Sequence, residues 1–222
     1  MAGEAGVPVV KIKNFRDRWV GTTEGNLEKI FRLLHALGRC FVFIDEADQT
    51  LGKRDAGSSD SGLSGRVYSM IAQEMGSSRT RGKVIWILAS SRPDLIEIDL
   101  KRPGRIDVRI PLFPTSGPEE GFGLLRALAK RFSLTLEDSA FETLKTVIPD
   151  LLTPAAAEAL AFKAYRATRT ESQSAEAAFK SLLENYRSPV DPEILELQVR
   201  LAAEEATDLE LVPARFRPAA RR

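Results

Sequence analysis

Cysteine and histidine are nearly absent from this 222-residue sequence, which contains one of each, Cys40 and His35. A single cysteine excludes an intrachain disulfide and is typical of proteins from a reducing compartment. Because no cluster of cysteine or histidine accompanies His35, a zinc site is not expected. Cys40 directly precedes an apolar run, so we expect a packed thiol there rather than a reactive one.

The sequence also lacks long apolar runs and an excess of charge of either sign. No stretch approaches the roughly 18 apolar residues of a transmembrane helix. Residues 1–6 do not join a basic segment to an apolar one, as a secretory signal does. With 32 basic and 31 acidic residues the net charge is +1, so no overall basic field favours nucleic acid. We therefore expect a soluble cytoplasmic protein that binds neither membrane nor nucleic acid.

The most informative segment runs from Phe41 to Asp48, where four apolar residues lead directly into carboxylates. Such a run suits a strand buried on both faces of a parallel sheet. Asp45 and Glu46 should then emerge at the carboxyl end of the strand, where open α/β sheets bind ligands. In nucleotide hydrolases an Asp at this point holds Mg²⁺, and a neighbouring carboxylate activates water. The alternative is a core strand that ends in two solvated acids.

Strand and helix patterns alternate through the first half of the chain. Apolar residues recur at helical spacing between short β-branched or apolar runs. This order is typical of a parallel sheet with helical crossovers, and therefore of an α/β domain. The expected strands cover residues 7–12, 41–44, 83–89 and, more weakly, 106–112, and the expected helices cover 24–37 and 65–75.

Strand signals stop at the Pro- and Gly-bearing segment 113–118. Helical spacing then continues in several short segments, which predicts a small helical domain. We divide the chain into an α/β core at 1–113, a helical domain at 114–187, and a C-terminal helix with a basic tail at 188–222. The Pro- and Arg-bearing tail is expected to be disordered.

Five short segments follow one another in a specific order: Trp19-Val20-Gly21, Thr22 to Leu27, Asp45-Glu46, Ala89 to Asp94, and Leu100 to Asp107. In this order they resemble the AAA+ ATPases, and specifically the classical AAA clade of ring-forming protein remodellers. The resemblance extends from residue 1 to about residue 187. It implies a P-loop NTPase core followed by a helical lid. Five motifs in matching order are far more specific than any one of them.

The resemblance implies a role for several charged residues. Asp45 matches the residue that holds Mg²⁺, and Glu46 matches the one that activates water. Arg102 and Arg105 match the arginine-finger segment, where planar and permanently charged donors stabilise a transferred phosphoryl group. Without the resemblance, the two arginines would be read as surface salt bridges at a Pro-Gly turn.

Trp19, Val20 and Gly21 match an aromatic-apolar-glycine loop that faces the central pore in the family. There, a large amphipathic ring beside a glycine hinge can grip an extended polypeptide. The alternative is a half-buried tryptophan that covers the sheet edge.

Two matched positions depart from the family pattern. Ser91 stands where the family usually has Asn; its hydroxyl can still bond the γ-phosphate or the water, but it has a shorter reach and one donor. Ala155 matches the nucleotide contact of the lid, where Pro154-Ala155 replaces the Gly-Ala pair that the family often has. Pro154 is compatible with the first turn of a helix.

The largest departure is the phosphate loop, because no Gly-x-x-x-x-Gly-Lys-Ser/Thr occurs in the sequence. The nearest segment, 77–84, lacks the first glycine and precedes a strand instead of following one. In the family, the loop lies about one helix upstream of the residues that match 2–8. The chain is either a fragment or a naturally short protein. We favour a fragment, because the strand at 7–12 would otherwise be an edge strand without its phosphate-loop neighbour.

The resemblance implies ATP and Mg²⁺ as cofactors, self-association into a ring of six subunits, and a polypeptide substrate. Our main hypothesis is therefore an ATPase module that remodels proteins. The alternative is a non-hydrolysing AAA-like module that joins such a ring but binds nucleotide poorly. A nucleic-acid motor is less favoured, because the charge balance does not call for one.

Overall fold

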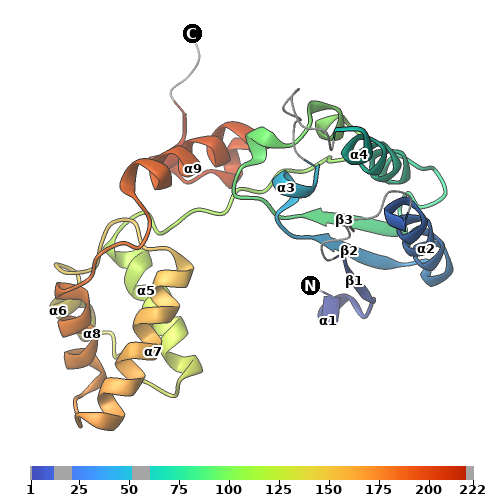
Figure 1. Ribbon diagram of the computed structural model, residues 1–222. Helices are drawn as coiled ribbons and strands as arrows, with labels where there is room; N and C mark the ends of the chain where they lie inside the picture. The colour runs from blue at the N-terminus through green and yellow to red at the C-terminus, as the bar shows by residue number, and fades with distance from the viewer. Residues whose placement is uncertain (1, 13–21, 52–60, 219–222) are drawn as a thin grey trace. The chain divides into compact units, whose positions relative to one another are not determined.

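The computed structural model describes residues 2–12, 22–51 and 61–218 (Figure 1). The chain forms two compact units, Met1–Arg109 and Ile110–Arg222. The first contains the strands and the second contains only helices and turns among its described residues. None of the helices within these described ranges is long and apolar enough to cross a membrane.

The first unit is built on a parallel three-stranded sheet, which confirms the α/β class. Its strands are β1 (Val9–Ile12), β2 (Cys40–Ile44) and β3 (Val84–Leu88), in the order β1-β2-β3. In the register of the sheet, Ile44 lies opposite both Ile12 and Leu88. The three carboxyl ends therefore meet at one edge, as the sequence predicts.

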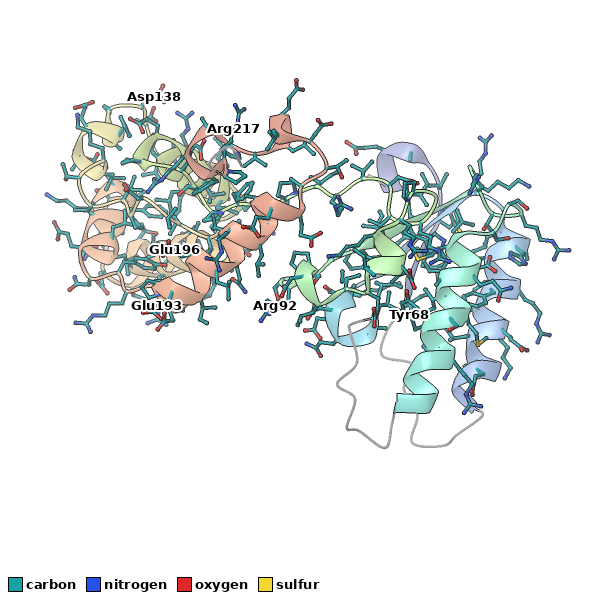
Figure 2. All side chains as sticks on the ribbon, turned by 90° about the horizontal axis from the view of Figure 1, so that it is seen from above. Tyr68, Arg92, Asp138, Glu193, Glu196 and Arg217 are labelled. Carbon is teal, nitrogen blue, oxygen red and sulfur yellow. The ribbon has the colours of Figure 1, made fainter. Side chains whose placement is uncertain are left out.

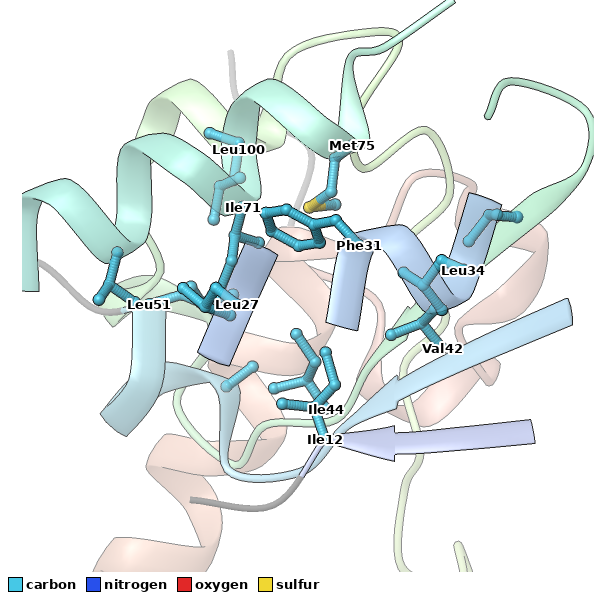
Figure 3. Packing of buried hydrophobic residues seen from close by; sticks show 14 of the residues in the cluster. Ile12, Leu27, Phe31, Leu34, Val42, Ile44, Leu51, Ile71, Met75 and Leu100 are labelled. Atoms are coloured by element: carbon cyan, nitrogen blue, oxygen red, sulfur yellow. The ribbon is translucent and has the colours of Figure 1, made fainter. Parts of the chain in front are cut away.

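One face of this sheet carries the core. Alternate residues of β2 are buried, and α2 (Thr22–Leu37) and α4 (Ser61–Met75) pack over them. Figure 3 shows Val42 and Ile44 pointing toward the apolar stripes of these two helices. Each large side chain that is fully buried here contributes about 1.5–3 kcal/mol to folding. The buried helix residues include Leu27, Phe31, Leu34, Ile71 and Met75.

The opposite face of the sheet is open among the described residues. Phe41 and Phe43 are only partly buried, so the prediction that β2 is buried on both faces is wrong. Val9 and Ile85 are 50% and 54% exposed. Short helices complete this unit, namely α1 (Ala2–Ala5), α3 (Ala47–Leu51), and the 3-10 turns η1 (Pro93–Leu95) and η2 (Ile98–Lys101).

The strand predicted at 106–112 is also wrong. These residues are irregular, and no described strand pairs with the free edge of β3. Val108, Ile110 and Leu112 are 62%, 67% and 89% exposed. An alternating apolar pattern forms a strand only where a neighbouring strand accepts its backbone hydrogen bonds, and the described residues provide none.

Among the described residues of the second unit, four helices pack around one core: α5 (Pro118–Arg131), α6 (Ala140–Leu144), α7 (Pro154–Thr170) and α8 (Ala175–Glu184). A further helix, α9 (Pro192–Glu205), buries Leu195 and Ala203 outside that cluster. Side-chain caps fix several of their amino ends. Thr153 accepts a hydrogen bond from the amide of Ala156, and Ser174 accepts one from the amide of Ala177. Each cap satisfies an amide that the helix leaves unpaired.

The C-terminal segment through residue 218 is ordered by specific contacts, so the prediction of a disordered tail is wrong for these residues. It forms the turns η3 (Leu209–Leu211) and η4 (Ala214–Phe216). The ring of Phe216 stacks on Phe113 with centroids 4.9 Å apart. Arg215 donates to the carbonyl oxygen of Ser116 at 2.7 Å and pairs with Asp150 at 3.2 Å. An aromatic ring and a guanidinium thus anchor a segment whose composition suggests disorder.

Candidate functional site

The predicted acidic pair lies at the carboxyl end of β2. Asp45 and Glu46 are both exposed, whereas the next residue, Ala47, is fully buried. The amide of Ala47 donates to the carbonyl oxygen of Ala89 at 2.9 Å, which ties the start of α3 to the end of β3. To make this turn, Glu46 adopts φ of 49°, in the left-handed region that non-glycine residues rarely occupy. The turn keeps the Glu46 carboxylate outside the core.

A polar turn follows β3 at the same edge of the sheet. Ser90 Oγ donates to Asp48 Oδ1 at 2.5 Å, and the amide of Arg92 donates to Ser90 Oγ at 3.0 Å. Ser91, which we predicted as the phosphate-sensing residue, is exposed. The structure therefore brings the acidic turn and the serine pair together, with Ser90 as the structural link and Ser91 directed to solvent.

Lys11 and Asp48 belong to this site, although we did not select them from the sequence. Lys11 lies near the end of β1, and its Nζ is 3.3 Å from Asp45 Oδ2. Both side chains are about half exposed, so solvent screens the pair and it adds little stability. The register of parallel strands could have indicated Lys11, since it lies opposite Phe43. Asp48 gives no signal beyond its place on the first turn of a helix.

The site fits a magnesium ion that the protein binds through one carboxylate and that water and phosphate oxygens bind at its other positions. Mg²⁺ usually binds one or two carboxylates and completes its shell with water and phosphate oxygens. Asp45 presents such a carboxylate, whose second oxygen, Oδ1, accepts from the amide of Glu46 at 3.2 Å. Among the described residues no cluster of three or more His, Cys, Asp and Glu residues could enclose a metal ion. A metal at Asp45 would therefore depend on a bound phosphate.

The two predicted finger arginines differ in their surroundings. Arg105 is partly buried, and its Nη1 donates to the carbonyl oxygen of Asp99 at 2.8 Å. Arg102 is exposed and pairs with the Asp99 carboxylate at 2.9 Å. Neither arginine bonds Asp45 or Glu46 within the described part of the chain. Arg105 thus braces the turn at η2, while Arg102 can leave its exposed ion pair and reach another group.

The neighbourhood of η2 also contains a partly buried tyrosine whose hydroxyl oxygen is buried. The hydroxyl of Tyr68, on α4, finds no partner among the described residues. Burial raises the pKa of Tyr68, the nearby carboxylates Asp99 and Glu97 raise it further, and the two arginines lower it. Figure 2 labels Tyr68 together with Arg92, which follows β3 in the sequence. Arg92 donates to both oxygens of Asp94 at 2.9 Å, and these bonds raise the pKa of Arg92, so its guanidinium is committed to that pair.

The remaining predicted residues lie elsewhere. Ala155 is exposed near the start of α7, in the second unit. Trp19, Val20 and Gly21 lie outside the described residues.

Comparison with known proteins identifies the family. Residues 1–113 match the model of the ATPase family associated with various cellular activities (AAA). The peroxisomal ATPase PEX6 of Dictyostelium discoideum is 33% identical over 125 residues, which are 56% of this chain and 10% of that relative. The pex6 protein of Schizosaccharomyces pombe is 32% identical over 60% of this chain and 15% of its own length. The peroxisomal ATPase PEX1 of Arthrobotrys oligospora is 32% identical over 63% of this chain and 12% of its own length.

The chain thus corresponds to a small part of these much longer relatives. The family match covers just over half of the chain, 113 of 222 residues, and coincides with the unit that carries the parallel sheet and the acidic pair. The α/β unit is a P-loop NTPase core, and the chain belongs to the AAA ATPase family, in its classical clade.

Proposed function

We propose that this chain is the greater part of an ATPase module that hydrolyses ATP with Mg²⁺ and remodels polypeptide substrates as a ring. The carrying observation is the acidic pair Asp45-Glu46, which an AAA-family core holds against the serine turn after β3. The name of the relatives, peroxisomal ATPase, supports the activity. Hydrolysis, ring formation and the polypeptide substrate are properties that we propose for the whole module, of which this chain is a part.

In this proposal the residues divide the chemistry between them. Asp45 holds Mg²⁺, which supplies positive charge to the phosphates when it is bound. The carboxylate of Glu46 orients the attacking water and accepts its proton. Ser91 donates one hydrogen bond from its hydroxyl, and Arg102 contributes a guanidinium from a neighbouring subunit. Arg105 holds Arg102 in position through the turn at η2.

The phosphate loop must come from a segment that this sequence does not contain. The free edge of β3 and the uncovered face of the sheet support a specific position for the strand and helix that flank this loop. Both visible crossovers, from β1 to β2 and from β2 to β3, carry their helices on the same face. A strand paired with the free edge of β3 and connected to β1 would cross the sheet in the opposite direction. Because such crossovers are right-handed, its helix would cover the other face, where Phe41, Phe43 and Ile85 are exposed or partly exposed.

The remaining assignments follow from the family resemblance. We propose that the helical unit acts as the lid, that Ala155 contacts the nucleotide, and that Trp19, Val20 and Gly21 form a pore loop. A hexameric ring and a cytoplasmic location stay predictions of the sequence.

The test joins a phosphate-binding segment to this chain and compares Glu46→Gln with the parent. The variant should retain ATP but lose hydrolysis by about 10²–10⁴-fold, because the water loses its general base. Glu28→Gln is the matched control, since Glu28 is an exposed helix residue whose ion pair among the described residues is with Arg32. A Glu46→Gln turnover within a few-fold of the parent would remove Glu46 from the mechanism.

A second candidate function is a non-hydrolysing module that joins an AAA ring. The missing phosphate loop favours it, because the loop amides and lysine supply much of the contact with ATP. The 222-residue chain alone should then bind ATP weakly. Titration of the chain with ATP tests this function, since micromolar binding would mean that the 222 residues recognise nucleotide without the loop and would contradict it.

A further inference from the structure

A hydroxyl group without a partner lies close to the turn that carries the two predicted finger arginines. The side chain of Tyr68, on α4, is partly buried, and its hydroxyl oxygen is buried and forms no hydrogen bond among the described residues. A buried hydroxyl usually finds a partner, because without one it loses its bonds to water on folding and gains none. The chemistry proposed above does not use this group.

The backbone of the turn is held against α4. Leu100, in η2, is fully buried in the core cluster to which α4 contributes (Figure 3). Arg105 Nη1 donates to the carbonyl oxygen of Asp99 at 2.8 Å. The Nε of Arg105 lies 3.8 Å from the position that a Cβ would occupy on Gly76, the residue after α4. These contacts fix the backbone of Asp99 relative to the helix that carries Tyr68.

The side chain of Asp99, in contrast, is held by a weak contact. Its Oδ1 lies 2.9 Å from Arg102 Nη2, and the side chains of Arg102 and Asp99 are 71% and 50% exposed. Water screens an ion pair this exposed, so Arg102 can leave it at a small cost in free energy. The carboxylate of Asp99 would then be free to accept a hydrogen bond from another donor.

Among the charged groups that act on the Tyr68 hydroxyl, Asp99 has the largest effect. Burial is the main cause that raises the pKa of Tyr68; Asp99 is the next, ahead of Glu97, while Arg105 and Arg102 lower it. A phenol bonds most strongly to an ionised acceptor such as a carboxylate. Arg102 holds the Asp99 carboxylate in the structure, which explains why the hydroxyl does not bond this acceptor.

We propose that Tyr68 is a positioning residue for the Arg102 finger: when Arg102 leaves Asp99 for a neighbouring subunit, the Tyr68 hydroxyl donates to the Asp99 carboxylate in its place. The exchange gives a partner to the buried hydroxyl and to the carboxylate in the same step, and it therefore offsets the lost ion pair. Only side chains have to rotate. The role in catalysis rests on the proposed function, whereas the exchange itself requires no ATP.

A double-mutant cycle on the 222-residue chain tests the exchange. Unfolding in urea is followed by tryptophan fluorescence, because both tryptophans, Trp19 and Trp86, belong to the first unit. In the parent, Tyr68→Phe removes an unpaired hydroxyl, so the urea midpoint should stay the same or rise. In Arg102→Ala the hydroxyl should bond Asp99, so Tyr68→Phe should lower the midpoint and reduce the folding equilibrium constant about tenfold.

Three further backgrounds identify the groups involved. Arg32→Ala is the matched control, since it removes another exposed arginine ion pair, on α2, and Tyr68→Phe should act there as in the parent. Within Arg102→Ala, Asp99→Ala should abolish the loss that Tyr68→Phe causes, and Glu97→Ala should preserve it. Arg102→Gln replaces Arg102→Ala if that variant disturbs folding. An equal effect of Tyr68→Phe in every background would overturn the proposal, and so would an effect that depends on Glu97 instead of Asp99.

Hydrolysis by the module with the joined phosphate-binding segment tests the role in catalysis separately. Tyr68→Phe should slow turnover about three- to tenfold without weakening ATP binding, because the released state of Arg102 loses a stabilising bond. If the parent module does not hydrolyse ATP, the proposed function fails, and the positioning role fails with it, while the urea experiment still decides the exchange. Unchanged turnover in an active module would limit the exchange to the stability of the first unit and overturn the positioning role.

Discussion

The bond between Ser90 and Asp48 joins two side chains that are 42 positions apart in the sequence. It connects the turn after β3 to the helix that begins just after Glu46. Ser90→Ala leaves a partly buried carboxylate without its donor, which should cost about 1–2 kcal/mol of unfolding free energy. Urea denaturation of the chain measures this. Ser90→Thr retains the hydroxyl and should restore most of the stability, whereas Ser91→Ala should change it by less than about 0.5 kcal/mol. A larger effect at Ser91 would contradict the assignment of Ser90 as the link.

Burial of the Cys40 thiol predicts how the free energy of unfolding changes at alkaline pH. Its side chain is 2% exposed, and burial raises the pKa of Cys40 above its ordinary value of 9.0. The unfolded chain loses the proton first. The contribution of the thiol to the free energy of unfolding is therefore fully present below pH 9.0 and is lost as the pH rises through the higher folded-state pKa.

The urea midpoint of the parent should decrease as the pH rises above 9.0, and the midpoint of Cys40→Ala should decrease less. The pKa of Tyr68, whose hydroxyl is buried, is also raised above its ordinary 10.0. The urea midpoint should therefore fall further at pH values above 10.0, and Tyr68→Phe should remove this second decrease. Identical alkaline profiles for the parent and Cys40→Ala would contradict the role of the thiol.

At the scale of elements, the C-terminal turn η4 fixes the segment at 113–116. A stacked aromatic pair contributes about 0.5–1.5 kcal/mol beyond burial, and Arg215 adds a charge-assisted bond to a backbone carbonyl. Phe216→Ala or Arg215→Ala should therefore speed hydrogen exchange of the amides around Ser116. Amides in α7 should keep their exchange rates, because the core of the second unit does not contain these residues. Unchanged exchange near Ser116 would mean that η4 does not restrain this segment.

The sequence identifies the three strands because each is a local apolar run of sufficient length. Sequence patterns fail where the outcome depends on a distant partner. Residues 106–112 alternate like a strand but find no neighbour, and the face of β2 that bears Phe41 and Phe43 has no cover among the described residues. The tail at 206–218 is ordered by contacts with residues about 100 positions earlier, which composition does not reveal.

The candidate site follows the same rule. The sequence predicts that Asp45 and Glu46 lie at the carboxyl end of a strand, because a buried strand does not readily carry two charged side chains. It does not predict Lys11 or the Ser90–Asp48 bond, because strand register and a long-range hydrogen bond bring these groups together. The structure also separates Arg102 from Arg105, which motif matching treats alike. Their contacts with Asp99 distinguish them: Arg102 forms an exposed ion pair with the carboxylate, and Arg105 stabilises the turn by donating to the backbone carbonyl oxygen.

At the scale of the whole molecule, the proposed ATPase needs a neighbour. Arg102 bonds neither Asp45 nor Glu46 within the described chain, which supports a finger that completes the site of another subunit. Such a finger accounts for about 10³–10⁵-fold in rate, since it meets charge that develops in the transition state. Activity should then require a ring and rise steeply with protein concentration.

Mixing two inactive proteins tests this. Both carry the joined phosphate-binding segment; one carries Glu46→Gln and the other Arg102→Ala, with Arg105 left intact because it supports the fold. Mixed rings contain interfaces that pair an intact Glu46 with an intact Arg102, so hydrolysis should recover in the mixture although each protein alone is inactive. Arg187→Ala, on an exposed residue of the second unit, is the control and should be active without mixing. If mixed rings form, as detected by co-purification of a tag, and hydrolysis does not recover, then Arg102 does not act between subunits.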